Sequence, residues 1–583
     1  MCTSILAVVV ILLVASPPHR AEAASRLVLQ NPVLLFPDPG AVAFTVSGAT
    51  GSVSWTVKDA DGDTVATGSE KSRGRTAKIA IGRAIPTGYY TFSFSSASDD
   101  EVTAAFGVTG PAPSDDTYYS VQTLSAHQGG IYRVDMHRII PMLKDLGFSS
   151  RRDSVYWSEY EQSPGAYVTP PSVARVLDDD AKYGMDLLWT AGSGNPLYDD
   201  GKLPSSPAAI QAYAEYIDAF LTEHPQVRLV EMFNEFNGTN DSACGATAAC
   251  YLDIAKTVYP FVKARHPDVT VIAGGVANVS LNWWRDFFSG GGAAYGDAFS
   301  YHPYNLTPSR LDEVAAEVMT LIKRGNDGVG KPLYLSEVGW SISDESSGNP
   351  AKVRTEAEQA DQLVYSFIAP QASPQVARVN WYQAIDSGST ATEYNFGLFQ
   401  DATPNVAGYQ PKRSAIAFYV MRTELDGYHY VRTDELASNV VSYVFGDGEG
   451  NIRQVVWRTD TFRSLDSATV PVTIPTSGKK YTSVVNVDGD RVASTSDGAR
   501  GIDQRISSSP LFVESSDSPL PTAQPAPVQR DATASAAPDA GRSVQPADAV
   551  KALVLLGAVI VAAAILYAVI RVVRRSSRGA GDR

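Results

Sequence analysis

The 583-residue sequence is poor in the residues that bind metals through sulfur or imidazole, with three cysteines and seven histidines. The histidines are scattered, and none of them pairs with a cysteine at the spacing of a zinc site. No Gly-x-Ser-x-Gly string is present, which argues against a serine hydrolase with a nucleophile elbow. We therefore expect no metal and no other cofactor.

Basic residues are also in deficit. Lys and Arg number 48 against 63 Asp and Glu, a formal net charge of −15. A surface of this sign repels nucleic acid and favours solubility. We therefore expect no nucleic-acid partner.

Long apolar runs are confined to the two ends of the chain. At the first end, Ile5 to Ala15 is followed by Ala21-Glu-Ala23, a small-residue cleavage site, although no Lys or Arg precedes the run. Residues 1–24 are therefore predicted to be an export signal peptide.

At the other end, Ala552 to Ile570 gives 19 residues without a charge. At about 1.5 Å of rise per residue, such a helix crosses the hydrocarbon core of a membrane. Arginines follow at once, and basic flanks stay in the cytoplasm. We predict a single-pass protein of the cell membrane. Its transmembrane helix at 552–570 would enter the lipid bilayer, with a cytoplasmic tail at 571–583 and an extracellular body.

The cysteines agree with export. Cys2 would leave with the signal peptide, and Cys244 and Cys250 would remain on the exported body. An even pair in an oxidising compartment usually forms a disulfide. The alternative is a pair of free, buried thiols.

The body of the chain changes its pattern along its length. Residues 27–110 alternate apolar and polar residues in short runs, which indicates a β-sandwich of immunoglobulin-like size. Residues 118–425 alternate strand and helix patterns. Residues 427–514 return to strands and indicate a second β-sandwich. Residues 515–550 are rich in Pro, Ala, Ser and Asp and predict a disordered stalk.

Eight strands are expected in the middle region, and helical patterns separate them. The strands begin near Tyr119, Phe148, Met185, Val227, Val269, Ala298, Leu333 and Val379. The clearest helices are expected at Ser206–Glu223, Cys250–Arg265, Pro308–Lys323 and Arg354–Ile368. This count predicts an α/β fold, a (β/α)8 TIM barrel at 118–425. The rival, a doubly wound open sheet, requires a Gly-rich loop after the first strand, which Val121 to His127 lacks.

Two strings carry the chemistry: Glu231-Met-Phe-Asn-Glu-Phe-Asn237 and Tyr334-Leu-Ser-Glu-Val-Gly-Trp340. Each is predicted as a strand that runs into a loop, and Glu235 and Glu337 stand at the strand ends. Active sites of barrels gather at these ends. Two carboxyl groups that face one cavity are the minimum equipment for breaking a glycosidic bond.

Other strand ends supply groups that bind sugars through hydroxyls and ring faces. They are Arg152, Asn234, His302, Tyr304 and Trp381. The loop Ala191 to Asp200 after the third strand is expected to line the same site. His302 could instead be a satisfied core histidine, and Trp381 could be barrel packing. Glu231 points to the same side as Glu235 and is either a partner of a site residue or bonded to a neighbour such as Arg228.

These motifs resemble those of clan A glycoside hydrolases, a group of (β/α)8 retaining enzymes, and most of all the family-39 branch and its bacterial relatives. Asn234-Glu235 is similar to the Asn-Glu at the end of the clan's fourth strand, and the string around Glu337 to that of its nucleophile. The resemblance covers the barrel, about half of the chain. Phe233 and Phe236 depart from the Trp and Pro usual there, which leaves the substrate open.

The resemblance implies the roles of the matching residues. Glu235 would be the acid/base, with a pKa raised by the neighbouring carboxylate, and Glu337 the nucleophile of a double displacement. Asn234 would bind the sugar 2-hydroxyl and Arg152 would contact the nucleophile. His302 and Tyr304 match a His-x-Tyr element beside it.

The leading hypothesis is a glycosidase that cleaves an extracellular poly- or oligosaccharide with retention. The alternative is a catalytically silent surface protein for carbohydrate binding or adhesion.

Overall fold

The computed structural model describes residues 27–517 except 98, 125–134, 239–241, 243, 305, 308–309, 344–351, 387–394, 460–467, 480 and 497–500. All of the described residues belong to one compact unit. The predicted signal peptide, transmembrane helix, basic tail and most of the stalk lie outside the described residues. Within the described part, no helix has the length and apolar character that a membrane span needs.

Eight parallel strands close into a barrel, which confirms the predicted fold of the middle region. Each strand begins within a few residues of its predicted start. They are β9 (Tyr119–Gln122), β10 (Ser150–Ser154), β13 (Asp186–Ala191), β14 (Leu229–Met232), β15 (Thr270–Ala277), β16 (Ala298–His302), β17 (Leu333–Val338) and β20 (Val376–Trp381).

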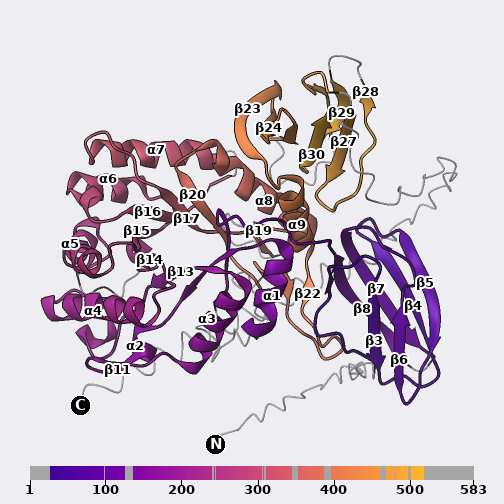
Figure 1. Cartoon of the computed structure of the whole chain (residues 1–583), viewed down its shortest axis with the longest axis horizontal. Coiled ribbons are helices and arrows are strands. Elements are labelled where there is room, and N and C mark those ends of the chain that lie inside the picture. The colour runs from indigo at the N-terminus through magenta and orange to yellow at the C-terminus, as the bar shows by residue number, and fades with distance from the viewer. Residues whose placement is uncertain are drawn as a thin grey trace, which may run out of the picture. The chain divides into compact units, whose positions relative to one another are not determined.

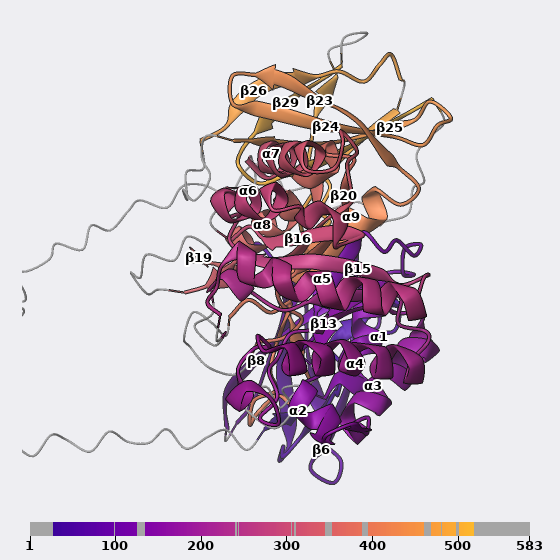
Figure 2. The ribbon, with the colours of Figure 1, turned by 90° about the vertical axis from the view of Figure 1, so that its left-hand side faces the viewer.

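Helices cover the outside of the barrel, as Figure 1 shows for the helices beside strands β13 to β17. Figure 2 shows four of these helices, α4 to α7, one above another on the face turned toward the viewer. The main helices are α1 (Met136–Leu146), α3 (Pro171–Tyr183), α4 (Pro207–Glu223), α5 (Ala248–Arg265), α6 (Leu281–Ser289), α7 (Leu311–Arg324), α8 (Glu356–Ile368) and α9 (Arg413–Glu424).

Hydroxyl side chains begin three of these helices. Ser206 caps α4 by accepting the amide of Ala209, and Thr247 caps α5 by accepting that of Cys250. Thr355 does the same for α8 through Glu358. A hydroxyl at this position satisfies an amide that has no partner inside the helix. The three caps therefore define the residues at which the preceding loops end and α4, α5 and α8 begin.

The inside of the barrel has an apolar floor and a polar upper layer. The floor is a separate apolar cluster of Leu188, Leu229, Ile272, Ala298 and Tyr334. Residues two positions further along a strand also point into the barrel. They lie one layer nearer to the carboxyl ends of the strands. On four of these strands the residues there are Thr190, Glu231, Ser300 and Ser336. The polar layer therefore lies at the end of the barrel where barrel enzymes place their chemistry.

A β-rich region precedes the barrel, in two sheets with a common core. Phe44 and Phe92, from different sheets, stack with ring centroids 3.9 Å apart. One sheet contains β1 (Val28–Leu29), β3 (Ala43–Ser47) and β6 (Thr76–Ala80); the other contains β2 (Leu35–Phe36), β8 (Asp99–Val108), β7 (Gly88–Ser96), β4 (Ser52–Asp59) and β5 (Thr64–Lys71). Flanking β-rich structure is confirmed, and the immunoglobulin-like class stays a prediction.

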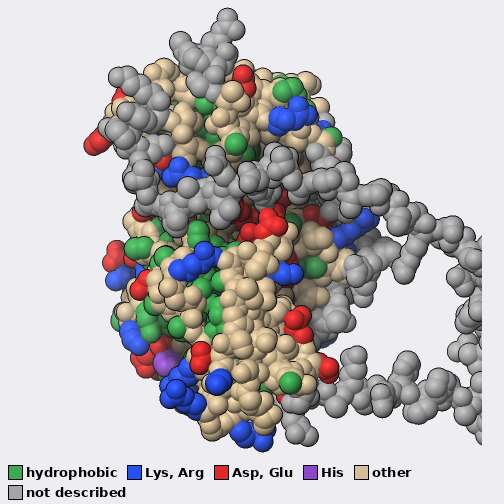
Figure 3. Space-filling view, turned by 90° about the vertical axis from the view of Figure 1, so that its right-hand side faces the viewer, with side chains coloured by type: hydrophobic (Ala, Val, Ile, Leu, Met, Phe, Trp, Pro, Cys, Tyr) green, Lys and Arg blue, Asp and Glu red, His purple; other side chains and the backbone are tan. Residues whose placement is uncertain are grey.

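A second β-rich region follows the barrel. One sheet has the order β23 (His429–Ala437), β24 (Val440–Gly446), β25 (Ile452–Arg458), β30 (Leu511–Ser516) and β27 (Tyr481–Asn486); the other has β26 (Val470–Ile474), β29 (Ile502–Ile506) and β28 (Thr495–Ser496). Strand β30 runs to Ser516, slightly beyond the predicted boundary at 514. On the face in Figure 3, acidic and basic side chains are interspersed over the described surface.

Candidate active site

A cavity of about 520 Å³ opens at the carboxyl end of the barrel strands. Its lining is mostly polar and comes from the strand ends and the loops after them. The lining residues are Gln122, Leu124, Arg152, Ser154, Tyr156, Gly192, Ser193, Asn234, Glu235, Ala277, Asn278, Tyr304, Glu337, Tyr382 and Phe396. Both predicted catalytic carboxylates face this cavity, as do Arg152, Asn234 and Tyr304.

Arg152 is the hub of the site. It points inward from β10 and its side chain is 2% exposed. Nη1 donates to Glu337 Oε1 at 2.5 Å and to Gln122 Oε1 at 2.9 Å, and Nη2 donates to Asn234 Oδ1 at 2.9 Å. Nε and Nη2 both donate to Glu231 Oε2, at 2.8 and 2.6 Å. Burial alone would lower the pKa of Arg152, but the charges of Glu231 and Glu337 outweigh burial and raise it.

Glu337 lies on β17 and is largely buried, with an exposed fraction of 8%. Besides Arg152, it accepts a hydrogen bond from the Tyr304 hydroxyl at 3.0 Å, through Oε2. Burial, and after it the charge of Glu337, raises the pKa of Tyr304 well above its ordinary value, so this hydroxyl remains a donor. Two donors from different elements thus hold the Glu337 carboxylate in one orientation.

Glu235 reaches the cavity from the turn after β14 and is more exposed, with 39% of its side chain accessible. His302, at the end of β16, is fully buried, and its Nδ1 lies 2.9 Å from Glu235 Oε1. The same nitrogen is 3.6 Å from Glu337 Oε2. His302 therefore lies behind the two carboxylates and is absent from the cavity lining. The prediction that it binds the sugar is wrong, because its ring is fully buried and already bonded to Glu235, as in the alternative of a satisfied core histidine.

The turn that presents Glu235 has an unusual backbone. Phe233 and Glu235 both have positive φ, at 67° and 47°. The amide of Glu235 donates to the carbonyl oxygen of Gly275 on β15 at 2.6 Å. Gly275 also has positive φ, and a Cβ at this position would lie 2.6 Å from the Phe233 carbonyl oxygen. Only glycine leaves room for this contact, so β15 props up the turn.

The pKa expectation for Glu235 is wrong. Burial raises the pKa of Glu235, but the hydrogen bond with His302, then the charges of His302 and Arg152, outweigh burial and lower it. Burial would also lower the pKa of His302, yet the charge of Glu337 and the hydrogen bond to Glu235 raise it. The prediction considered only the neighbouring carboxylate, whereas a hydrogen bond with His302 and the charge of Arg152 also act on Glu235.

The two carboxylates approach each other closely. Glu235, His302 and Glu337 each offer a side-chain atom within 4.8 Å of those of the other two. Such a group could hold a cation by distance alone. However, the guanidinium of Arg152 already occupies Glu337, and the His302 nitrogen that faces the carboxylates is bonded to Glu235. These contacts fit a proton-transfer site better than a metal centre, so we assign no cation to the group.

Residues 201–409 match the family model described as glycosyl hydrolase catalytic core. The chain is a glycosidase. The expected enzyme class is thereby confirmed, and among curated proteins no match was found.

Solved structures share the fold of this glycosidase. A family 39 glycoside hydrolase from the gut symbiont Bacteroides cellulosilyticus WH2 has 20% identity and a TM-score of 0.67, covering 84% of this chain and 100% of that one. A monomeric beta-xylosidase from Caulobacter crescentus CB15 has 15% identity and a TM-score of 0.50, covering 69% of this chain and 97% of that one. The sequence motifs and the similar solved structures thus both point to family 39.

Trp381, like His302, was predicted to bind sugar but does not line the cavity of the glycosidase. Trp381 is fully buried, and its indole nitrogen donates to the carbonyl oxygen of Phe396 at 3.2 Å. It is absent from the cavity lining, and Tyr382 and Phe396 face the cavity instead. The structure favours the packing alternative for Trp381, because the side chain points outward from the strand end into the core.

Several cavity residues were not anticipated from the sequence. Gln122 and Asn278 stand at or just after the ends of β9 and β15, so the rule of polar residues at strand ends would have found them. Tyr156 and Phe396 come from loops, and no periodicity marks them. Gly192 and Ser193 do belong to the loop that was expected to line the site.

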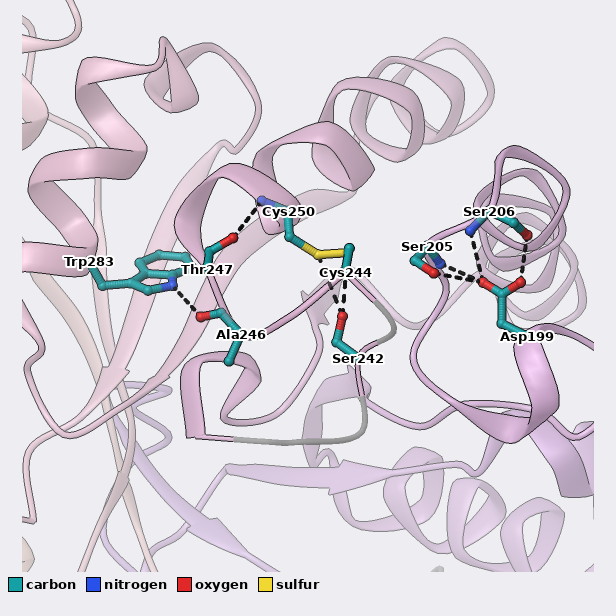
Figure 4. The surroundings of a disulfide bond; sticks show 9 residues. All are labelled: Asp199, Ser205, Ser206, Ser242, Cys244, Ala246, Thr247, Cys250 and Trp283. Atoms are coloured by element: carbon teal, nitrogen blue, oxygen red, sulfur yellow. Dashed lines mark hydrogen bonds between the residues drawn. A yellow bond between two sulfur atoms is a disulfide. The ribbon is translucent and has the colours of Figure 1, made fainter.

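A disulfide fixes the segment that follows Glu235. Cys244 and Cys250 are bonded, which ties this segment to the first turn of α5 (Figure 4). Trp283 donates to the carbonyl oxygen of Ala246 in between, at 3.3 Å. Nearby, Asp199 accepts the amides of Ser205 and Ser206 and so ends the loop after β13. Both loops beside the cavity are therefore anchored to helix starts.

Proposed function

We propose that this glycosidase acts with retention, by double displacement, on an extracellular poly- or oligosaccharide. The carboxylate spacing carries the proposal. Retaining enzymes separate their two carboxyl groups by about 5–5.5 Å and inverting enzymes by about 6.5–9.5 Å. Side-chain oxygens of Glu235 and Glu337 within 4.8 Å of each other support the first class.

Glu337 would attack the anomeric carbon. Its two donors, Arg152 at Oε1 and Tyr304 at Oε2, hold the carboxylate at the cavity in one orientation and stabilise its charge. The attack forms a glycosyl-enzyme ester at Glu337 and releases the leaving-group oxygen, which must receive a proton.

Glu235 would supply that proton from the pair it forms with His302. His302 Nδ1 lies 2.9 Å from Glu235 Oε1, so the two groups can share a proton. A sugar over the cavity displaces water from the half-exposed Glu235, which disfavours its charged form. The proton then moves to Glu235 and on to the leaving oxygen. In the second step the deprotonated carboxylate of Glu235 accepts a proton from water, which attacks C1 of the ester.

Asn234 would bind the sugar beside the reacting carbon. Because Arg152 donates to its amide oxygen, the amide nitrogen is free to donate into the cavity. This orientation supports the hydroxyl-binding role that the motif resemblance implies.

We also propose that the N-terminal β-rich region braces the cavity. Val406, from the segment between β20 and α9, is buried in the core of that region. Phe396 of the same segment lines the cavity. Removal of residues 27–110 would therefore free a wall of the active site.

The predicted signal peptide and C-terminal apolar run support an extracellular location, with the chain held to the cell membrane at its C-terminus. The Cys244–Cys250 disulfide agrees with an oxidising compartment.

The test is the configuration of the first product. The full-length chain is incubated with a panel of polysaccharides and aryl glycosides, and NMR follows the anomer formed before mutarotation. Retention is expected with every substrate that is turned over. Inversion would contradict double displacement, and binding without turnover anywhere on the panel would favour the silent surface protein.

A further inference from the structure

A third carboxylate, Glu231, lies beneath the two that face the cavity. It is fully buried inside the barrel on β14 and is absent from the cavity lining. Its Oε2 accepts both Nε and Nη2 of Arg152 and, at 3.0 Å, the hydroxyl of Thr190. Burying a carboxylate costs desolvation free energy, so the presence of Glu231 at this position requires an explanation.

Glu231 is ionised in this environment. Burial raises its pKa, but the charge of Arg152, followed by that of His302, outweighs burial and lowers it. The hydroxyls of Ser300 and Ser336 lower it further. The site therefore contains three carboxylates, one permanent cation, Arg152, and one titratable imidazole, His302.

Arg152 connects Glu231 to the reacting groups. The edge of the guanidinium that Glu231 holds is the Nε–Nη2 edge, and Nη1 is then left to reach Glu337. Nη2 also reaches Asn234. Because a guanidinium is planar and rigid, fixing one edge fixes the positions of all its donors.

The charge of Glu231 also acts on the proton of the Glu235–His302 pair. His302 lies 2.9 Å from Glu235 and 3.6 Å from Glu337, and its ring is edge-on to Tyr304. The charges of Arg152 and Glu231 also act on it. Arg152 lowers the pKa of both His302 and Glu235. The negative charge of Glu231, bonded to Arg152, counteracts this lowering of the two pKa values. The attraction between Glu231 and His302 further favours a protonated His302.

We propose that Glu231 is a positioning residue that sets two properties of the active site: it orients Arg152 toward Glu337 and Asn234, and its buried charge keeps the shared proton on the Glu235–His302 pair. The proposal rests on the proposed function, in which that proton is delivered to the leaving group.

The test compares three variants of the full-length chain. Glu231→Gln keeps the shape and removes the charge. Glu231→Asp keeps the charge and shortens the reach. Thr190→Val, the matched control, removes a hydrogen bond to the same oxygen without changing any charge.

The first readout is the pH profile of kcat/KM on a nitrophenyl glycoside that the wild type hydrolyses. In Glu231→Gln we expect the basic limb to move to lower pH by about one pH unit, because an opposite charge near His302 is lost. We also expect kcat to fall roughly 10- to 100-fold as Arg152 loses its orientation. Glu231→Asp should lower kcat but keep the limb, and Thr190→Val should keep the limb as well.

The second readout is independent of turnover. With ¹⁵N-labelled histidine, NMR follows the titration of the His302 ring, assigned by its loss in His302→Gln. This titration should move to lower pH in Glu231→Gln and stay in Thr190→Val. If no glycoside is hydrolysed by the wild type, the proposed function fails while this titration still decides the role of Glu231.

An unchanged basic limb and an unchanged His302 titration in Glu231→Gln would overturn the proposal. So would an equal shift in Thr190→Val, since packing alone would then explain it. If Glu231→Gln does not fold, Glu231→Asp decides: a basic limb at the wild-type position with reduced kcat supports the proposal, and a displaced limb contradicts it.

Discussion

Two clusters in this glycosidase are built around an arginine and several carboxylates, and they differ in how completely the charges are compensated. The first is the active-site cluster of Arg152, Glu231, Glu235, Glu337 and His302. The second, here called the junction cluster, contains Arg413 of α9, Asp488 of the C-terminal β-rich region, and Glu356 and Asp361 of α8. Both lie among packed elements, and only the first opens on the cavity.

In the junction cluster the arginine serves one carboxylate. Arg413 binds both oxygens of Asp488, with Nε at 2.9 Å from Oδ1. Glu356 accepts the Arg413 amide and the side chain of Gln400, and Asp361 accepts the Ser509 hydroxyl. Each carboxylate thus has its own donor, and the cluster joins the barrel to the region that follows it.

In the active-site cluster one guanidinium is divided between two carboxylates, and a third relies on a histidine. That arrangement leaves Glu235 half-exposed to the cavity and dependent on a movable proton. The comparison indicates that a stabilising cluster gives each charge a fixed partner. A proton-transfer site instead needs one carboxylate that can exchange a proton with its partner. Four variants separate the two cases.

Glu337→Gln should give the largest effect. Glu337 is the proposed nucleophile, and its removal is expected to lower kcat on the order of 10⁴-fold or more. The matched variant in the junction cluster is Glu356→Gln, which should retain kcat. Steady-state kinetics on the same glycoside make the comparison, and equal losses in both variants would mean that folding, rather than chemistry, is being measured.

Asp488→Asn should act on stability and leave catalysis alone. It removes the charge that a bidentate arginine binds at a side chain only 7% exposed, so the free energy of unfolding should fall by about 2–3 kcal/mol. Denaturant unfolding measures this. Asp503→Asn, which removes the charge from an exposed acceptor of the Thr473 hydroxyl, should change stability by less than about 0.5 kcal/mol. A reduced kcat in Asp488→Asn would break the division between the clusters.

Tyr304→Phe should lower kcat by about 10-fold, because it removes one of the two donors to Glu337 and leaves the ring packing in place. Tyr259→Phe is the control, since it removes a similar bond to Asp297 far along α5. Steady-state kinetics should therefore show a kcat that is about 10-fold lower in Tyr304→Phe than in Tyr259→Phe. If Tyr259→Phe shows the same loss, the Tyr304 bond has no special role.

Asp361→Asn should give the smallest effect, visible only through pH. Burial raises the pKa of Asp361 from its ordinary 3.8 to about 7. The folded chain therefore holds a proton that the unfolded chain releases, and the stability that this provides is full below about pH 4 and lost as pH rises through 7. The variant lacks this dependence, so relative to wild type it should gain about 1 kcal/mol between pH 4 and pH 8, since the side chain is partly exposed. Urea unfolding of both proteins at pH 4 and pH 8 tests this. If the free energy of unfolding changes equally with pH in the variant and the wild type, the raised pKa of Asp361 is contradicted.

Sequence patterns predicted the barrel well because strand and helix patterns are local signals. The starts of all eight barrel strands and the helix expected at Ser206–Glu223 could be seen in single segments. The strand-end rule also located Glu235, Glu337 and Arg152 at the cavity.

What depends on contacts between strands was harder to foresee. The lowered pKa of Glu235 arises from His302, which is distant in sequence, and the partner of Glu231 proved to be Arg152 on another strand. Trp381 was misjudged because strand parity near a strand end does not reveal whether a ring turns toward the cavity or the core.

The close approach of Gly275 to the Glu235 turn has a consequence for how such a chain can be recombined. The turn that carries Glu235, the proposed acid/base, is supported by a backbone contact with the next strand, where any side chain would collide with the Phe233 carbonyl. A chimera whose crossover falls between the two positions would combine a turn from one parent with a support from another. Crossovers outside residues 233–275 keep the turn and its support from the same parent.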